Sequence, residues 1–173
     1  MHMLQLSALI LNRPIMSLRT GTRVAVATKP IINPNNLKIE GFYCTDSRSN
    51  HQLVLLCQDI RDNIAQGFVI DDHDVLAEPH ELVRLEKVLK LQFELIGKPI
   101  QTVNKQRVGK VSDYAVDSSS MYIQKIYASQ SLFKSFTGGS LSIDRSQINE
   151  ITDKRIIINE LLKGNPAAAA AGI

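Results

Sequence analysis

The sequence predicts a mainly β protein made of two small tandem β-barrels that a short helix joins. Three observations predict this class: an internal repeat, short alternating segments separated by turn-forming residues, and little helical periodicity. The chain has 173 residues, of which 44% are apolar and 5% aromatic, and it has no tryptophan. We therefore expect cores built from Ile, Leu and Val.

The repeat relates the first half of the chain to the second. Three pairs of segments carry it, at shifts of 85, 84 and 73 residues: 4–15 with 89–100, 23–43 with 107–127, and Ile70-Asp71 with Ile143-Asp144. We therefore expect one copy at residues 1–87, which includes the linking helix, and a second at residues 88–163. A helix stop and an alanine run predict a flexible tail at residues 164–173.

The strands are predicted from side-chain alternation and from turns. Apolar and polar residues alternate over residues 89–95 and 121–128, which predicts a strand in each segment. The turn-formers at 33–36 and 117–120 occupy equivalent places before strands of the two copies. The β-branched run at residues 156–158 predicts a buried closing strand. Small closed barrels would hide the edges of such sheets.

Helix is predicted only in short pieces. Asp144 with Gln147 resembles a capping box, and Asp71 with Asp74 is expected to begin a similar turn in the first copy. A longer helix is expected from Pro79 through Leu82, Leu85 and Leu89, which share one helical face. Since no Gly/Ser linker follows it, we expect the two copies to be docked against each other.

The second copy resembles the PRC-barrel domain family, which includes the C-terminal domain of the ribosome maturation factor and the cytoplasmic domain of the photosynthetic reaction-centre H subunit. Three stretches carry the resemblance: Gly97-Lys98-Pro99-Ile100, residues 107–117 around Val108-Gly109-Lys110-Val111, and Gly139 to Ile148. The first copy matches more weakly, because Ala25 replaces the glycine and Lys29 stands opposite Asp113. The resemblance implies two tandem PRC-type barrels.

The resemblance also implies a function. It suggests a non-catalytic adaptor or docking protein of the bacterial cytoplasm, without catalytic residues or cofactor, that acts in ribosome maturation or RNA metabolism through protein–protein contacts. The expected partner is a protein, such as a ribosomal one, and the oligomeric state stays open. Two alternatives remain: a scaffold of a membrane-associated complex of division or photosynthetic type, and a small metal-binding enzyme that uses the acidic segment 71–80.

Charge and cysteine content limit the kinds of partner and the compartment that we expect for the protein. The net charge is +3, with −1 over residues 1–96 and +4 over residues 97–173, so a polyanion would favour the second half. Cys44 and Cys57 are expected to be buried free thiols in a reducing compartment. No segment has the roughly 20 apolar residues that a membrane helix needs, so we expect a soluble protein.

Two groups of residues are candidate binding sites. Apolar side chains and a lysine in the segment before Gly138 are predicted to bind a protein partner, unless they cover a barrel end or the contact between copies: Leu132, Phe133, Lys134 and Phe136. A basic strip is a candidate polyanion contact, unless it only confers solubility: Lys105, Arg107, Lys110 and Lys125. Aromatics for base stacking are few there, Tyr114 and Tyr122 being the available ones.

Metal and catalytic sites are weakly indicated. The segment 71–80 contains acidic and imidazole groups, but its spacing matches no standard metal site, so no metal ligand is predicted. Phosphate-loop, dinucleotide and nucleophile-elbow motifs do not occur, and no Ser, His and Asp are arranged as a triad. His2 is interpreted as a cloning remnant.

Overall fold

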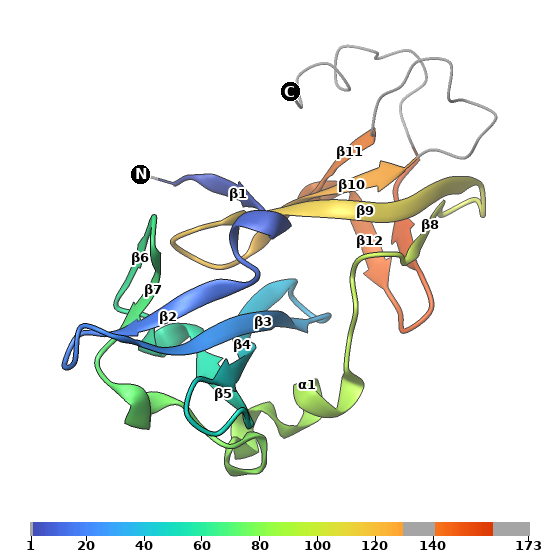
Figure 1. Ribbon diagram of the computed structural model, residues 1–173. Helices are drawn as coiled ribbons and strands as arrows, with labels where there is room; N and C mark the ends of the chain where they lie inside the picture. The colour runs from blue at the N-terminus through green and yellow to red at the C-terminus, as the bar shows by residue number, and fades with distance from the viewer. Residues whose placement is uncertain (1, 130–140, 161–173) are drawn as a thin grey trace.

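A computed structural model describes residues 2–129 and 141–160, and this part of the chain is mainly β (Figure 1). It contains two sheets and one short α-helix, α1 (Glu86–Leu91), which lies beside the first sheet. The predicted mainly β class is therefore confirmed. The tail predicted at residues 164–173 lies outside the described residues.

The first sheet is formed by residues 13–70 in the order β5-β4-β3-β2-β7-β6. Its strands are β2 (Arg13–Ser17), β3 (Arg23–Asn33), β4 (Lys38–Asp46), β5 (Gln52–Leu56), β6 (Asp62–Ile64) and β7 (Gly67–Ile70). The pair β2–β7 is parallel, and the other pairs are antiparallel.

The second sheet has the order β11-β10-β9-β8-β13-β12, and β1 pairs with β9 outside this path. Its strands are β1 (Leu4–Leu6), β8 (Pro99–Thr102), β9 (Arg107–Asp117), β10 (Ile123–Ser129), β11 (Leu141–Asp144), β12 (Ile148–Ile151) and β13 (Ile156–Ile158). The pair β8–β13 is parallel, as β2–β7 is in the first sheet. The two halves therefore share one strand order and one pattern of strand directions.

Strand register corrects part of the predicted repeat. In the parallel pairs, Ser17 lies opposite Ile70 and Thr102 lies opposite Ile158, so Ile70 corresponds to Ile158. The predicted match of Ile70-Asp71 with Ile143-Asp144 is therefore wrong, since it joins the end of β7 to the end of β11. A two-residue match is weak evidence, and the register of a whole strand pair outweighs it.

The predicted closed barrels are not found. Among the residues that the structure describes, the ladder of the first sheet ends at β5 and β6, and the ladder of the second ends at β11 and β12. No strand pair joins these ends, so each half has an open six-stranded path.

Two predicted turns form in the same way. Oδ1 of Asn33 accepts a hydrogen bond from the amide of Asn35 at 3.0 Å, and Oδ1 of Asp117 accepts one from the amide of Ser119 at 2.9 Å. Each turn closes at a residue with positive φ, 55° at Leu37 and 60° at Met121. The short polar side chains therefore fix both turns, as the sequence predicts.

The strand predicted over 89–95 does not form. The segment enters α1, which an ion pair between Glu86 and Lys90 spans at 2.6 Å, and leaves it at Gln92 with φ 44°. Phe93 and Leu95 are buried in the loop that follows. Alternation here reflects these two buried side chains, which a loop can also present to a core.

The linking helix is shorter than predicted. Two 3₁₀ turns, Pro79–Glu81 and Val83–Leu85, precede α1, and Leu82 between them has non-helical dihedral angles. The capping box of Asp144 with Gln147 is confirmed at the 3₁₀ turn Arg145–Gln147. The short turn predicted at the corresponding place of the first copy also forms, at His73–Val75, but its N-cap is Asp72 and no side chain caps it.

The strand predicted over 121–128 is mostly confirmed, but its alternation is interrupted. A register shift lies between Ile123 and Lys125, so Ile123 and Ile126 are both buried although they are three positions apart. Such a bulge reverses which face later side chains occupy. The predicted closing strand at residues 156–158 is β13, and its first and last residues, Ile156 and Ile158, are fully buried.

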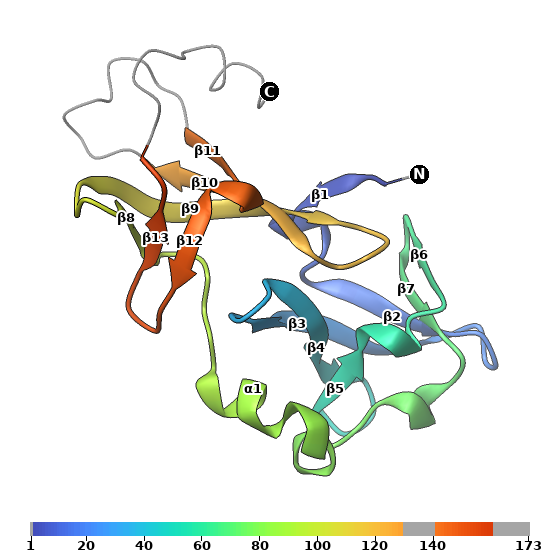
Figure 2. The same cartoon turned by 180° about the vertical axis from the view of Figure 1, so that it is seen from behind.

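The halves contact each other at equivalent positions. The amide of Ile39 donates to the carbonyl of Met121 at 2.8 Å, and the amide of Ile123 donates to the carbonyl of Leu37 at 2.9 Å. Leading segments also cross over, since β1 pairs with β9 of the second sheet and α1 packs near β3 of the first (Figures 1 and 2). One continuous hydrophobic core includes side chains of both halves. The expected docking of the copies agrees with these contacts.

Candidate functional site

A cavity of about 790 Å³ lies in the second half. It is bounded by β8, by the start of β9, by the end of β10 and by the turn between β12 and β13. Its lining consists of Pro99, Ile100, Gln101, Arg107, Val108, Gly109, Lys110, Ser129, Lys154 and Arg155.

Of the described residues that line this cavity, four are cations and none is a carboxylate; the cations are Arg107, Lys110, Lys154 and Arg155. All four residues are exposed. Arg155 donates to Oε1 of Gln101 at 3.1 Å, and the ion pairs in the described part of the chain involve none of the four. Positive charges gathered around a concave surface raise the local concentration of anions.

Strand order explains how the cations are arranged. Strand β8 lies between β9 and β13 in the sheet. Arg107 and Lys110 are on β9, whereas Lys154 and Arg155 immediately precede β13. The apolar wall residues from β8 therefore lie between two pairs of cations.

A bulge places consecutive residues of β9 against the cavity. Ile100 pairs with Gly109, but Gln101 pairs with Arg107, so Val108 is the extra residue. In a regular strand only alternate residues share a face. The bulge is the reason that Arg107, Val108, Gly109 and Lys110 all line the same space.

The first half has a different set of residues at the corresponding positions. By strand register, Arg23, Val26, Gln66 and Gly67 correspond to the four cations, so only one of them is charged. Gly67 is also closely packed, since a Cβ there would lie 2.2 Å from the carbonyl oxygen of Pro14. The two halves therefore share one scaffold, and the basic cavity is a feature of the second half.

The predicted basic strip is only partly assembled. Arg107 and Lys110 line the cavity. Lys105 lies in the turn before β9, and Lys125 lies on β10, opposite Asp144 of β11. Lys154 and Arg155 were not predicted as site residues. They directly precede the β-branched run 156–158, which was the available signal, but the parallel pairing of β13 with β8 is needed to place them.

The predicted partner-binding residues lie outside the described residues. These are Leu132, Phe133, Lys134 and Phe136. They remain a prediction.

The acidic segment 71–80 is divided among separate contacts. Asp71 pairs with Arg61 at 2.8 Å, and Asp72 accepts hydrogen bonds from Ser17 and Arg19. In the part of the chain that the structure describes, no group of three or more His, Cys, Asp or Glu side chains is close enough to hold a metal ion.

A buried carboxylate organises the end of β4. Asp46 accepts hydrogen bonds from the amide and hydroxyl of Ser49, at 3.1 and 2.5 Å, and its Oδ1 lies 2.8 Å from Nε2 of His73. These contacts, the Ser49 hydroxyl foremost, hold the pKa of Asp46 well below its usual range. The arrangement stabilises the loop between β4 and β5.

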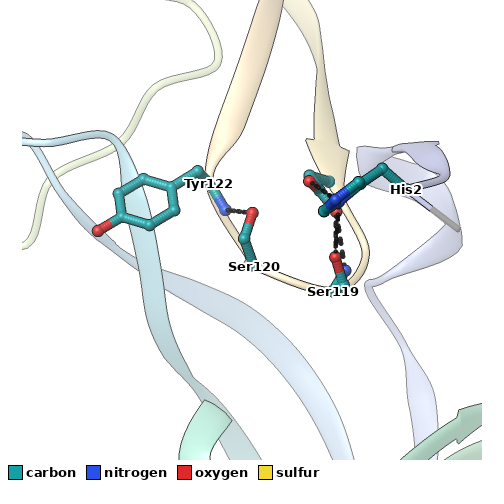
Figure 3. Close-up of polar contacts among 5 residues, drawn as sticks. His2, Ser119, Ser120 and Tyr122 are labelled. Atoms are coloured by element: carbon teal, nitrogen blue, oxygen red, sulfur yellow. Dashed lines mark hydrogen bonds and ion pairs between the residues drawn. The ribbon is translucent and has the colours of Figure 1, made fainter.

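A second group brings together Ser, His and Asp side chains. Nδ1 of His2 lies 2.9 Å from Asp117 and 3.0 Å from the hydroxyl of Ser119 (Figure 3). In a catalytic triad the serine and the aspartate contact different ring nitrogens. Here both contacts fall on one nitrogen, and Ser119 donates directly to Asp117 at 2.8 Å, so this group closes a turn.

The two cysteines are free thiols, with Cys44 fully buried and Cys57 partly buried. Burial raises the pKa of each thiol to about 12. Cys57 donates a weak hydrogen bond to the carbonyl of Ile39 at 3.2 Å. Both thiols are therefore packing groups in the first half.

No model of a known protein family matches this chain, and no curated protein matches it. Within the described residues no helix has the length and apolar character needed to cross a bilayer.

Proposed function

We propose that the protein is a non-catalytic docking protein whose second half binds a partner at the basic cavity. The observation that carries this proposal is the lining itself, whose described residues place four cations on two sides of an apolar wall and include no carboxylate. Complementary charge steers a partner to such a surface and fixes its orientation. The PRC-type resemblance of the second half supports ribosome maturation or RNA metabolism as the setting.

The composition of the cavity favours docking over catalysis. The described residues of its lining include no His, Cys, Asp or Glu, the residue types that most often act as acids, bases or activated nucleophiles. The internal repeat gives further support, because the first half has the same scaffold with a cation at only one of the four corresponding positions, Arg23. A charge pattern added to one copy of a scaffold is typical of a site that serves recognition.

Co-sedimentation tests this proposal. The chain is mixed with ribosomal subunits and, separately, with anionic liposomes, and each pellet is assayed for the protein. We expect the subunits to carry it down and the liposomes to leave it in the supernatant. Recovery with liposomes alone would instead favour a membrane-associated scaffold, and recovery with neither would contradict a ribosomal role.

A matched pair of double variants locates the contact. Arg107→Glu with Lys154→Glu reverses one cation on each side of the cavity. Arg23→Glu with Lys87→Glu makes the same change in net charge at exposed positions of the first half and the linker. We expect only the first pair to abolish co-sedimentation, because only that pair removes the cations around the apolar wall. Equal losses would show that net charge alone drives binding.

A further inference from the structure

We infer that the cavity binds an acidic peptide segment in which an apolar side chain lies between carboxylates. This inference rests on the proposed docking function and specifies the chemistry of the partner. It follows from the arrangement of the lining, in which the β8 residues lie between the β9 cations and the cations that precede β13.

The apolar wall is the first argument. Pro99, Ile100 and Val108 contribute to the lining. Pro99 is exposed and Val108 is half-buried, so these two side chains offer apolar surface to a ligand, whereas Ile100 is only 1% exposed and supports them from the core. A purely ionic ligand would leave this apolar surface unused. A peptide with a leucine-like side chain would cover it and gain affinity from the area removed from water.

The scarcity of suitable aromatic groups argues against RNA. Among the described residues that line the cavity, none is aromatic. Tyr114 is 1% exposed, and the ring of Tyr122 has Lys38 at 5.6 Å and Arg145 at 5.1 Å. Recognition of unpaired RNA commonly uses bases stacked on exposed aromatic rings. Tyr114 is therefore inaccessible to a base, and two cations already lie near the ring of Tyr122.

The size of the cavity is the third argument. At about 790 Å³ it lies within the range of about 300–1,000 Å³ that is usual for ligand pockets. It has room for a few side chains of an extended segment, but it is too small for a packed helix pair or a globular surface. A short peptide with alternating acidic and apolar residues matches both the size and the two-sided charge.

Fluorescence anisotropy with the full chain tests the inference directly. The probe is a labelled, end-capped peptide that alternates Asp and Leu, compared with a peptide in which Ser replaces each Leu and with single-stranded oligouridylate. We expect the Asp/Leu peptide to bind about tenfold more tightly than the Asp/Ser peptide, since one apolar contact of this kind changes affinity by about that factor. Oligouridylate is expected to bind more weakly than the Asp/Leu peptide.

Variants connect the result to the cavity. Arg107→Glu with Lys154→Glu should weaken binding of the Asp/Leu peptide at least about tenfold, because two cations are replaced by repelling charges. The control pair Arg23→Glu with Lys87→Glu should leave it unchanged. Val108→Thr, which keeps the volume of the side chain, should reduce the preference for Leu over Ser. Circular dichroism establishes that each variant is folded.

Three results would overturn the inference: equal affinity for the Asp/Leu and Asp/Ser peptides, tighter binding of oligouridylate, or no peptide binding. The co-sedimentation assay separates these failures from failure of the docking function. Suppose that Arg107→Glu with Lys154→Glu abolishes co-sedimentation with ribosomal subunits but that no peptide binds the unaltered chain. In that case the inferred peptide chemistry is wrong, while the cavity is still the docking surface.

Discussion

Arg145 joins the two halves, and its replacement by alanine gives a measurable prediction. Its guanidinium donates to the carbonyl of Ile123 at 3.2 Å and to that of Asn36 at 2.5 Å, and it lies 5.1 Å from the ring centre of Tyr122. A hydrogen bond from a charged donor contributes about 1.5–3 kcal/mol, and an exposed cation–π contact about 0.5–1 kcal/mol. Because the side chain is half-buried and water replaces part of these contacts, we expect Arg145→Ala to cost about 2–3 kcal/mol.

Urea unfolding followed by circular dichroism measures this loss. The control is Lys38→Ala, which removes the other cation near Tyr122, at 5.6 Å, and should cost about 0.5–1 kcal/mol. The stability loss of Arg145→Lys should lie between those of Arg145→Ala and Lys38→Ala, because lysine keeps the charge but cannot reach both carbonyls in the same geometry. If Arg145→Ala destabilises the chain no more than Lys38→Ala does, the hydrogen bonds of Arg145 do not hold the two halves together.

Three further predictions concern the scaffold. Gly67→Ala should cost more than about 2 kcal/mol in thermal or urea unfolding, because φ is +151° and the new Cβ would lie 2.2 Å from a backbone oxygen of β2, whereas Gly21→Ala, with φ +66° and open space, should cost about 1 kcal/mol. Because folding lowers the pKa of Asp46, its contribution to the free energy of unfolding should be fully present above its ordinary pKa of about 4 and should be lost as pH falls below that value. Asp46→Asn should flatten this dependence of stability on acid pH, and an unchanged profile would contradict the lowered pKa. Cys44 and Cys57, with pKa raised to about 12, should react with a thiol reagent at pH 8 only after unfolding; fast reaction of the native chain would show that they are accessible.

The sequence predicts those features that are local in the chain. The turns at Asn33 and Asp117 were predictable because a short polar side chain bonds to an amide two residues on. The capping box at Asp144 is local in the same sense. The alternation at residues 89–95 misleads because periodicity records burial and does not specify what covers a buried side chain.

Contacts between distant segments were not predictable from pattern. The cavity depends on the parallel pairing of β13 with β8, which brings Lys154 and Arg155 to the wall formed by Ile100. Arg107 and Lys110 could be predicted as basic neighbours on one strand. The bulge at Val108, which turns four consecutive residues toward one space, has no marker in the sequence beyond Gly109.

The most direct test of docking at the second half is an NMR titration of the ¹⁵N-labelled chain with the Asp/Leu peptide. Docking at the cavity should give saturable shifts of the amides of Gly109, Lys110 and Arg155, with the amides of Val26 and Gly67 at the corresponding positions of the first half unchanged. Shifts that affect both halves equally, or that leave the cavity amides unmoved, would contradict it.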